Sequence, residues 1–289
     1  MKNLLKIKLL AFAVTSLFAQ SAYSFGFDDL KNLDIDKISN IAKKTEGLKP
    51  VDNNAEADIG KGVAANLLGA APLVQNEPLQ RYVNQLGTWL AMQGERPEVK
   101  WRFAVIDSDG VNAFAAPGGY VFVTKGMLLR MRNEAELAGV LSHEIAHVLK
   151  KHHLNAIQKS SQTSIMGDLA GMAVDTKQYG ELAKKAISAG TELYARGLDK
   201  EDEFEADRMG VVIAAKAGYD PYGLPAVLQT LEAINPQDSG LALMTKTHPT
   251  PTARIQKLDA LMNKNLDKYA TQPQVEDRFV QTVGNYARK

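Results

Sequence analysis

GVLSHEIAHVLKKHH, residues 139–153, contains four of the five histidines of this 289-residue chain. Its apolar residues recur at helical spacing, which predicts a largely buried helix from an Asn133 N-cap to His153. At 3.6 residues per turn, His143 and His147 lie one turn apart on the same face of that helix. Both imidazoles can therefore reach a single zinc ion.

Glu144 follows the first of these histidines and lies about 100° further round the helix. It is poorly placed to share the metal, but it can take a proton from a metal-bound water, which is the chemistry of an H-E-x-x-H motif. The alternative is a chance match with both histidines merely hydrogen-bonded, but burying them unpartnered is costly, which favours the metal site. His152 and His153 follow two lysines at the polar end of the helix, so we expect them on the surface, outside the site.

A catalytic zinc site needs a third protein ligand and one open position. No other histidine lies nearby, so a carboxylate is expected, and a helix predicted over 199–217 supplies EDEFEAD. Glu203 and Asp207 share a face of that helix, whereas Glu205 points elsewhere. One carboxylate can bind the metal while the other hydrogen-bonds a ligand histidine. The alternative is a solvated acidic helix start, stabilised by the helix dipole.

The remaining patterns predict an α+β, mainly helical protein. Helical spacing covers 59–93, and further helices are expected near 222–234 and 252–263. Alternating residues and a PGG turn predict a small antiparallel sheet over 101–124, beside the histidine helix. Residues 155–200 have weaker periodicity, and they form either a mobile cover over a cleft or an ordinary pair of helices.

Composition excludes some classes of protein. A 45% hydrophobic content supports one substantial core or two small ones. The net charge of +1, without a basic stripe, argues against nucleic-acid binding. The chain has no cysteine, so it has neither disulfides nor a cysteine that could be acylated near the N-terminus.

Residues 1–24 resemble a secretory signal peptide. Lysines come first, an apolar run follows, and small residues precede a cut that would leave Phe25 as the mature N-terminus. A retained membrane anchor is the alternative, but the apolar run is shorter than the ~20 residues of a spanning helix. We therefore expect an exported protein, periplasmic in a bacterium with two membranes.

Taken together, the motifs resemble those of metallopeptidase family forty-eight. HEIAH is followed along the chain by EFEAD (203–207), and three further stretches fit the same family. NAFAAPGGYVFVTKGML (112–128) resembles its substrate-side hairpin, and EADRMGVVIAAKAGYDP (205–221) resembles the continuation of its ligand helix. THPTPTARI (247–255) resembles its downstream His-Pro segment, which has an arginine six residues later. The resemblance covers roughly residues 60–263.

The resemblance implies a zincin-like metallopeptidase domain with one Zn²⁺ per chain. It implies His143, His147 and Glu203 as metal ligands, Glu144 as the catalytic base, and Asp207 as the supporting carboxylate.

It further implies that His248 can reach the metal and hold the site closed, accompanied by the basic residue Arg254. With the signal peptide, it divides the chain into a linker and helix, a metallopeptidase domain and a tail, at residues 25–58, 59–265 and 266–289. The membrane helices and helical-repeat extension of some members have no counterpart here, so the chain resembles the exported, soluble branch.

These features predict a zinc-dependent endopeptidase of the cell envelope that degrades misfolded or unassembled exported proteins, with Glu144 as general base. The strand around residues 112–115 is expected to offer its edge to an extended polypeptide. Peripheral contact with a membrane is compatible with this prediction, and the sequence does not indicate an oligomeric state. One alternative is a latent or chaperone-like zinc protein capped by His248, and another is a metal-free helical protein.

Overall fold

The computed structural model describes residues 51–165, 194, 196–234 and 239–287. They belong to one compact unit, residues 47–289. The predicted signal peptide, the start of the mature chain at Phe25 and most of the predicted linker lie outside the described residues. So does much of the segment 155–200, for which a cover or a helical pair was expected.

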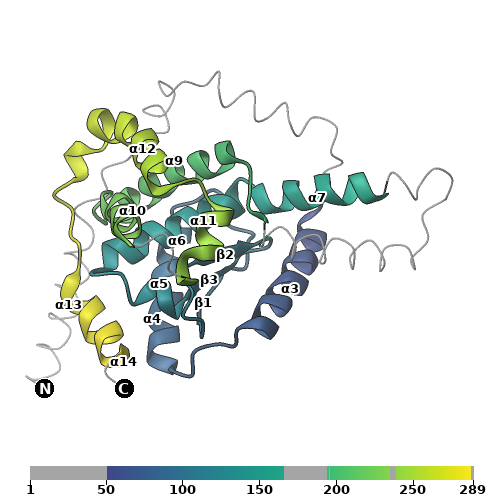
Figure 1. Ribbon diagram of the computed structural model, residues 1–289, viewed down its shortest axis with the longest axis horizontal. Helices are drawn as coiled ribbons and strands as arrows, with labels where there is room; N and C mark the ends of the chain where they lie inside the picture. The colour runs from purple at the N-terminus through teal and green to yellow at the C-terminus, as the bar shows by residue number, and fades with distance from the viewer. Residues whose placement is uncertain (1–50, 166–193, 195, 235–238, 288–289) are drawn as a thin grey trace, which may run out of the picture. The chain divides into compact units, whose positions relative to one another are not determined.

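Helices dominate the fold, and among them the described residues form one three-stranded sheet (Figure 1). In chain order, the elements are α3 (Asn53–Ala70), α4 (Glu77–Ala91), β1 (Arg102–Ile106), β2 (Ala113–Ala116), β3 (Tyr120–Thr124), α5 (Lys125–Leu128), α6 (Glu134–Leu149), α7 (His152–Ile165), α9 (Lys200–Lys216), α10 (Gly223–Ala233), η2 (Ser239–Leu241), α11 (Ala242–Thr247), α12 (Pro251–Asn265), η3 (Asp267–Tyr269), α13 (Glu276–Phe279), η4 (Val280–Gly284) and α14 (Asn285–Ala287). The predicted α+β, mainly helical class is confirmed. The single helical stretch expected over 59–93 is two helices, separated near Pro72.

The prediction of an all-antiparallel sheet is wrong for one of its two strand pairs. β2 and β3 form the expected antiparallel hairpin around the PGG turn, with Ala113 opposite Val123. β1 pairs with β3 in parallel, because the strand order is β1-β3-β2. β1 and β3 run in the same direction, and β2 runs in the opposite direction. The sheet would be all-antiparallel only if β2 lay in the middle, but β3 lies between β1 and β2. This order leaves β2 at an edge.

Helix α6 lies between the sheet on one side and α9 and α10 on the other (Figure 1). Its N-terminus is capped as predicted, since the Asn133 side chain accepts a hydrogen bond from the backbone N–H of Glu136. Nearly every residue of α6 is buried, because neighbours cover it on all sides. The histidine helix is therefore the central element of the core.

The helix predicted to continue to His153 instead ends four residues earlier. Lys151 adopts a left-handed backbone conformation with φ 57°, and α7 begins at the next residue. Left-handed geometry is unfavourable for residues other than glycine, so it interrupts a helix. The resulting corner changes the direction in which the side chains of the KKHH stretch point.

The chain after α12 also packs against the body of the fold. Phe279 and Val283 are buried, and the Arg278 guanidinium pairs with Glu134 in the first turn of α6. The hydroxyl groups of Tyr82 and Tyr219 donate to the same carboxylate. Within the described ranges, no helix is both long and apolar enough to cross a bilayer.

Candidate metal centre

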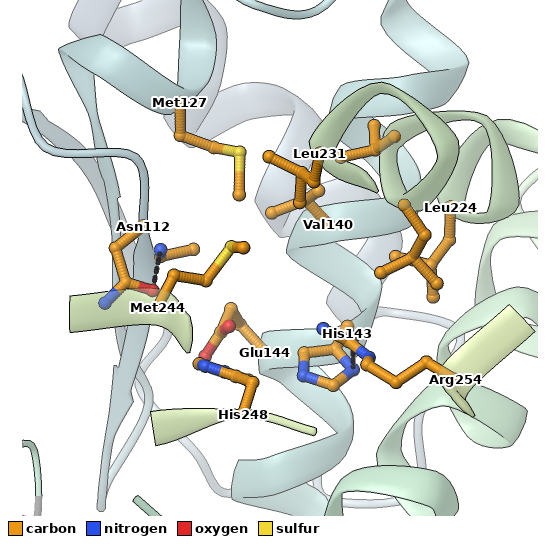
Figure 2. Close-up of a pocket in the computed structure, with 13 residues that line it drawn as sticks. Asn112, Met127, Val140, His143, Glu144, Leu224, Leu231, Met244, His248 and Arg254 are labelled. Atoms are coloured by element: carbon orange, nitrogen blue, oxygen red, sulfur yellow. Dashed lines mark hydrogen bonds between the residues drawn. The ribbon is translucent and has the colours of Figure 1, made fainter. Parts of the chain in front are cut away.

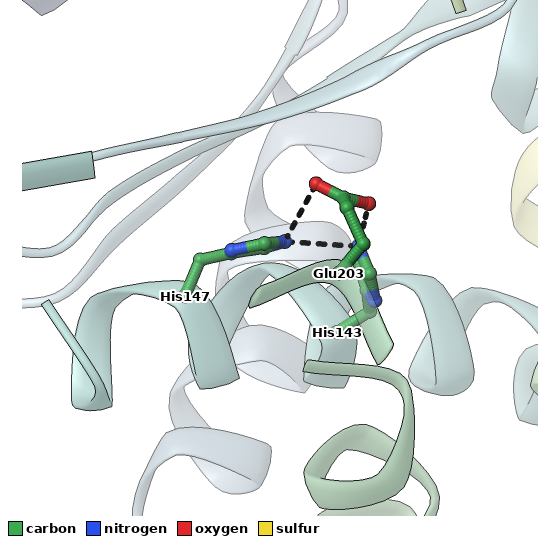
Figure 3. A group of neighbouring side chains, drawn as sticks. All are labelled: His143, His147 and Glu203. Atoms are coloured by element: carbon green, nitrogen blue, oxygen red, sulfur yellow. Dashed lines mark hydrogen bonds and ion pairs between the residues drawn. The ribbon is translucent and has the colours of Figure 1, made fainter. Parts of the chain in front are cut away.

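The candidate site lies where α6 and α9 pack together. Gly210 permits this contact, because a Cβ there would lie only 2.9 Å from the backbone nitrogen of His143. Glu203 lies two turns before Gly210 on α9 and faces the two histidines of α6 (Figure 3). The close packing of α6 against α9 at Gly210 therefore brings these residues together.

His143, His147 and Glu203 present metal-binding atoms to one point (Figure 3). The two Nε2 atoms are 3.1 Å apart, and the Glu203 carboxylate oxygens lie 3.7 Å from that of His143 and 3.6 Å from that of His147. Two ligands bound tetrahedrally to zinc at about 2.0–2.1 Å are about 3.3 Å apart. The spacing of the three side chains thus fits one small ion.

The electrostatic environment of these residues also fits a cation. Glu203 is buried, and no hydrogen-bond partner is found for its Oε2 atom within the described part of the chain. Burial raises the pKa of Glu203 well above its usual range and lowers the pKa values of His143 and His147. Lower pKa values favour the neutral imidazole, which is the form that binds metal. A bound cation would compensate the buried carboxylate.

Behind His143 lies the carboxylate of Asp207. Its Oδ1 is 2.9 Å from Nδ1 of His143, and the Arg254 guanidinium donates to both carboxylate oxygens. Burial alone would raise the pKa of Asp207, but the charge of Arg254 and its hydrogen bonds lower it. Asp207 is therefore an ionised acceptor for an Nδ1–H on His143.

Behind His147 lies His152, and the prediction that His152 and His153 are on the surface is wrong. His152 is buried and His153 is half-buried. Nδ1 of His152 is 3.0 Å from Nδ1 of His147, and its Nε2 is 3.3 Å from the carboxylate of Glu205. Glu205, expected to point elsewhere, also forms an ion pair of 2.8 Å with Lys150. The α6–α7 corner causes the difference by turning His152 inward.

Glu144 lies beside the metal-binding atoms in a pocket that also contains Asn112, Met127, Met244 and His248 (Figure 2). Burial raises the pKa of Glu144 to about 8, and the positive charge of nearby Arg254 opposes this rise. The carboxyl group can therefore exchange a proton near neutral pH.

His248 follows α11 and faces the same centre. Its Nε2 lies 3.6 Å from Oε2 of Glu203, and its Nδ1 lies 2.9 Å from the hydroxyl of Thr247. With His143 and Glu144, it forms a second group of potential metal-binding atoms. The structure thus places every predicted site residue around one centre: His143, Glu144, His147, Glu203, Asp207, His248 and Arg254.

The edge strand β2 runs beside this centre. Because Thr124 N–H donates to the carbonyl of Asn112, the backbone groups of Ala113 and Ala115 point away from β3, toward the free edge. The hydroxyl of Tyr194 donates to the outward carbonyl of Ala115. Part of the edge expected to receive a substrate is therefore already occupied.

Comparison with known proteins identifies the family. A model described as Peptidase family M48 matches residues 77–262. The chain belongs to Peptidase family M48. The predicted resemblance to metallopeptidase family forty-eight is therefore confirmed, together with the zincin-like fold class.

Curated relatives of this M48 chain come from bacteria and mitochondria. The Beta-barrel assembly-enhancing protease of Escherichia coli (strain K12) is 31% identical over 205 residues, which cover 69% of this chain and 42% of that protein. The Putative beta-barrel assembly-enhancing protease of Vibrio cholerae is 32% identical over 189 residues, or 64% of this chain and 39% of that protein. The Mitochondrial metalloendopeptidase OMA1 of Schizosaccharomyces pombe is 29% identical over 191 residues, which cover 66% of this chain and 55% of that protein. The match to the two bacterial proteins spans less than half of their lengths.

Sequence reasoning about this M48 domain missed three side chains around the centre. On a continuous helix, His152 would lie about 140° away from His147, so only the corner at Lys151 brings it alongside. Glu205 depends on that same corner for its partner. Tyr194 lies in the stretch with weak periodicity, so no pattern indicated its contact with β2.

Proposed function

We propose that this chain is a zinc-dependent endopeptidase that uses Glu144 as its general base. The observation that supports this most strongly is the buried Glu203 carboxylate, which faces two neutral imidazoles directly beside Glu144. The proposed catalytic domain spans residues 59–265, followed by the segment 266–289.

The proposed ligands are His143, His147 and Glu203, with one ion per chain. When bound, zinc polarises a peptide carbonyl and lowers the pKa of a coordinated water towards ~7. Glu144 accepts the proton of the attacking water on its carboxylate and then donates it to the leaving nitrogen. Asp207, held by Arg254, keeps His143 oriented through its Nδ1–H.

The proposed substrates are polypeptides of the cell envelope that are misfolded or unassembled. An extended chain can pair with the outward carbonyl of Ala113 and the outward N–H of Ala115, which provide backbone recognition with little sequence preference. The outward N–H of Ala113 already donates to the Asn112 side chain, and the outward carbonyl of Ala115 accepts from Tyr194. The envelope as location is supported by the signal-like residues 1–24 and by the relatives named for β-barrel assembly. No nucleic-acid partner is proposed, because the charge of the chain is near zero.

The test is cleavage of casein by the purified mature protein, with zinc content measured on the same sample. We expect stoichiometric zinc and cleavage in the wild type. Glu144→Gln should keep the zinc and lose the cleavage, because the amide cannot accept the proton. Cleavage retained in this variant would refute the assigned base.

A second candidate function is a latent or chaperone-like zinc protein whose site is capped. Two observations favour it: the approach of His248 to Glu203, and the hydrogen bond from Tyr194 to the edge strand. His248→Ala should then raise casein cleavage, and Tyr194→Phe should raise it less, because only one edge contact is released. Zinc-loaded wild type and variants that are all inert on unfolded proteins would instead favour a binding role.

A further inference from the structure

The contacts behind His147 limit where the protons of His147 and His152 can lie once a metal is bound. If His147 binds a metal through Nε2, the nitrogen that faces Glu203, that atom carries no proton. A neutral imidazole then has its proton on Nδ1. This Nδ1–H points at Nδ1 of His152, 3.0 Å away. His152 must therefore accept the hydrogen bond on that nitrogen.

The same reasoning continues one step outward. A His152 ring that accepts on Nδ1 must carry its N–H on Nε2. This Nε2 faces the carboxylate of Glu205 at 3.3 Å. A carboxylate only accepts, and Lys150 holds its other oxygen at 2.8 Å. Only one arrangement of protons satisfies the whole chain from His147 to Glu205.

We propose that His152 is a positioning residue for the metal centre: it accepts the His147 Nδ1–H and so holds the bare Nε2 toward the metal, and Glu205 fixes the tautomer of His152. This inference rests on the proposed zinc site. In this arrangement, His147 is supported by the His152 imidazole and, beyond it, by the Glu205 carboxylate. His143 contacts the carboxylate of Asp207 directly. Such outer partners fix ring orientation and raise ligand basicity.

The α6–α7 corner that turns His152 inward is itself braced. The Arg96 guanidinium donates to the backbone carbonyl of Val148 and pairs with Glu56 through two hydrogen bonds. Glu56 also lies 3.3 Å from Nζ of Lys151, the residue with left-handed backbone geometry. α3 and the loop after α4 thus support the end of the histidine helix from outside the metal site.

The direct test is the tautomer of each histidine in the zinc-loaded full chain, read from long-range ¹H–¹⁵N spectra of the imidazole rings. We expect His143 and His147 to carry their protons on Nδ1, and His152 to carry its proton on Nε2. A His152 protonated on Nδ1, or on both nitrogens, would overturn the inference. This measurement uses the wild type, so it does not depend on whether any variant folds.

The second test is zinc affinity by competition with a chelator. His152→Phe keeps a ring but cannot accept a hydrogen bond, and it should weaken zinc binding about 10- to 100-fold. His153→Phe is the matched control for packing: the His153 ring also lies against His147, with ring centroids 5.2 Å apart, but its Nδ1 has no hydrogen-bond partner among the described residues. Its zinc affinity should fall less than that of His152→Phe. Equal affinities for these two variants would overturn the inference.

A rescue experiment separates positioning from packing. Glu205→Gln retains an acceptor for the Nε2–H of His152 and should keep most of the zinc affinity, whereas Glu205→Leu should lose it. Similar affinities for both variants would contradict the chain of hydrogen bonds. If the wild type binds no zinc at all, the proposed function fails and this inference with it. If the wild type binds zinc and His152→Phe binds it equally well, only the inference fails.

Discussion

The two histidines of HEIAH are held from behind in different ways. His143 contacts Asp207, which is fully buried and is neutralised by an Arg254 side chain that is also buried. His147 contacts His152, and the charge of Glu205 lies one residue further away, beside a Lys150 side chain that is 39% exposed. The group behind His143 is a buried ion pair. The group behind His147, which we call the relay, runs from His152 through Glu205 to the partly exposed Lys150.

This difference has energetic consequences. A buried ion pair becomes very unfavourable when one partner is removed, because the remaining charge is not solvated. A relay that reaches water can replace a lost partner with solvent, so its removal costs less. We therefore expect the Asp207 side to control folding, and the His152 side to control mainly the geometry of His147.

The largest expected effect is that of Asp207→Asn in zinc-free protein. The variant leaves Arg254 buried without a counter-charge, so the free energy of unfolding should fall by about 3–5 kcal/mol in urea denaturation. Glu205→Gln should lower it by only about 1 kcal/mol. A double variant, Asp207→Leu with Arg254→Met, should recover much of the loss. Equal losses of unfolding free energy in Asp207→Asn and Glu205→Gln would contradict the proposed difference between the two sides of the site.

The corner between α6 and α7 offers the next test. Lys151→Pro cannot adopt a φ of 57°, since proline is fixed near −65°, and it should cost about 3 kcal/mol or more. Lys151→Gly accepts this conformation and is the matched control. Zinc affinity should fall in the proline variant, because His152 no longer turns inward. If both variants fold and bind zinc with the same affinity, the corner does not affect the metal site.

The Arg96–Glu56 ion pair behind that corner predicts that the stability of the protein depends on pH. Burial acts to raise the pKa of Glu56, but hydrogen bonds and charge from Arg96 lower it below its ordinary value of 4.5. Its contribution is therefore present above that value and is lost as the pH falls through the lower folded pKa. Glu56→Gln should be less stable than wild type by about 1–3 kcal/mol at neutral pH, with a smaller difference in acid. Unfolding free energies measured across the acid range check this, and a constant difference would contradict it.

The smallest effect is expected at the exposed end of the relay. Lys150→Ala should lower the free energy of unfolding by about 0–1 kcal/mol, and the difference should shrink at high salt. The loss in Asp207→Asn should persist at high salt, because that pair is buried. Urea denaturation of both variants at two salt concentrations makes the comparison. If the loss of unfolding free energy in Lys150→Ala does not change with salt concentration, this end of the relay is not solvated.

The sequence predicted the elements whose signals are local. The cap at Asn133, the spacing of HEIAH and the shared face of Glu203 and Asp207 all depend on a regular helix. The proposed ligands and their carboxylate partner could therefore be located before the structure was known.

What the sequence could not predict depends on breaks in regularity or on pairing across the chain. The left-handed Lys151 changes the direction in which His152 points, and helical periodicity assumes that no such break occurs. The parallel pairing of β1 with β3 depends on which strand lies in the middle, and alternation along one strand carries no information about its neighbours.

The most direct test of the metal centre is anomalous diffraction at the zinc edge from crystals of zinc-loaded protein. We predict one peak, at about 2.0–2.2 Å from Nε2 of His143, Nε2 of His147 and a carboxylate oxygen of Glu203. A fourth contact from Nε2 of His248 would identify the capped, latent form of the same site. The absence of a peak between α6 and α9, or a peak that one of the two histidines does not contact, would contradict the account.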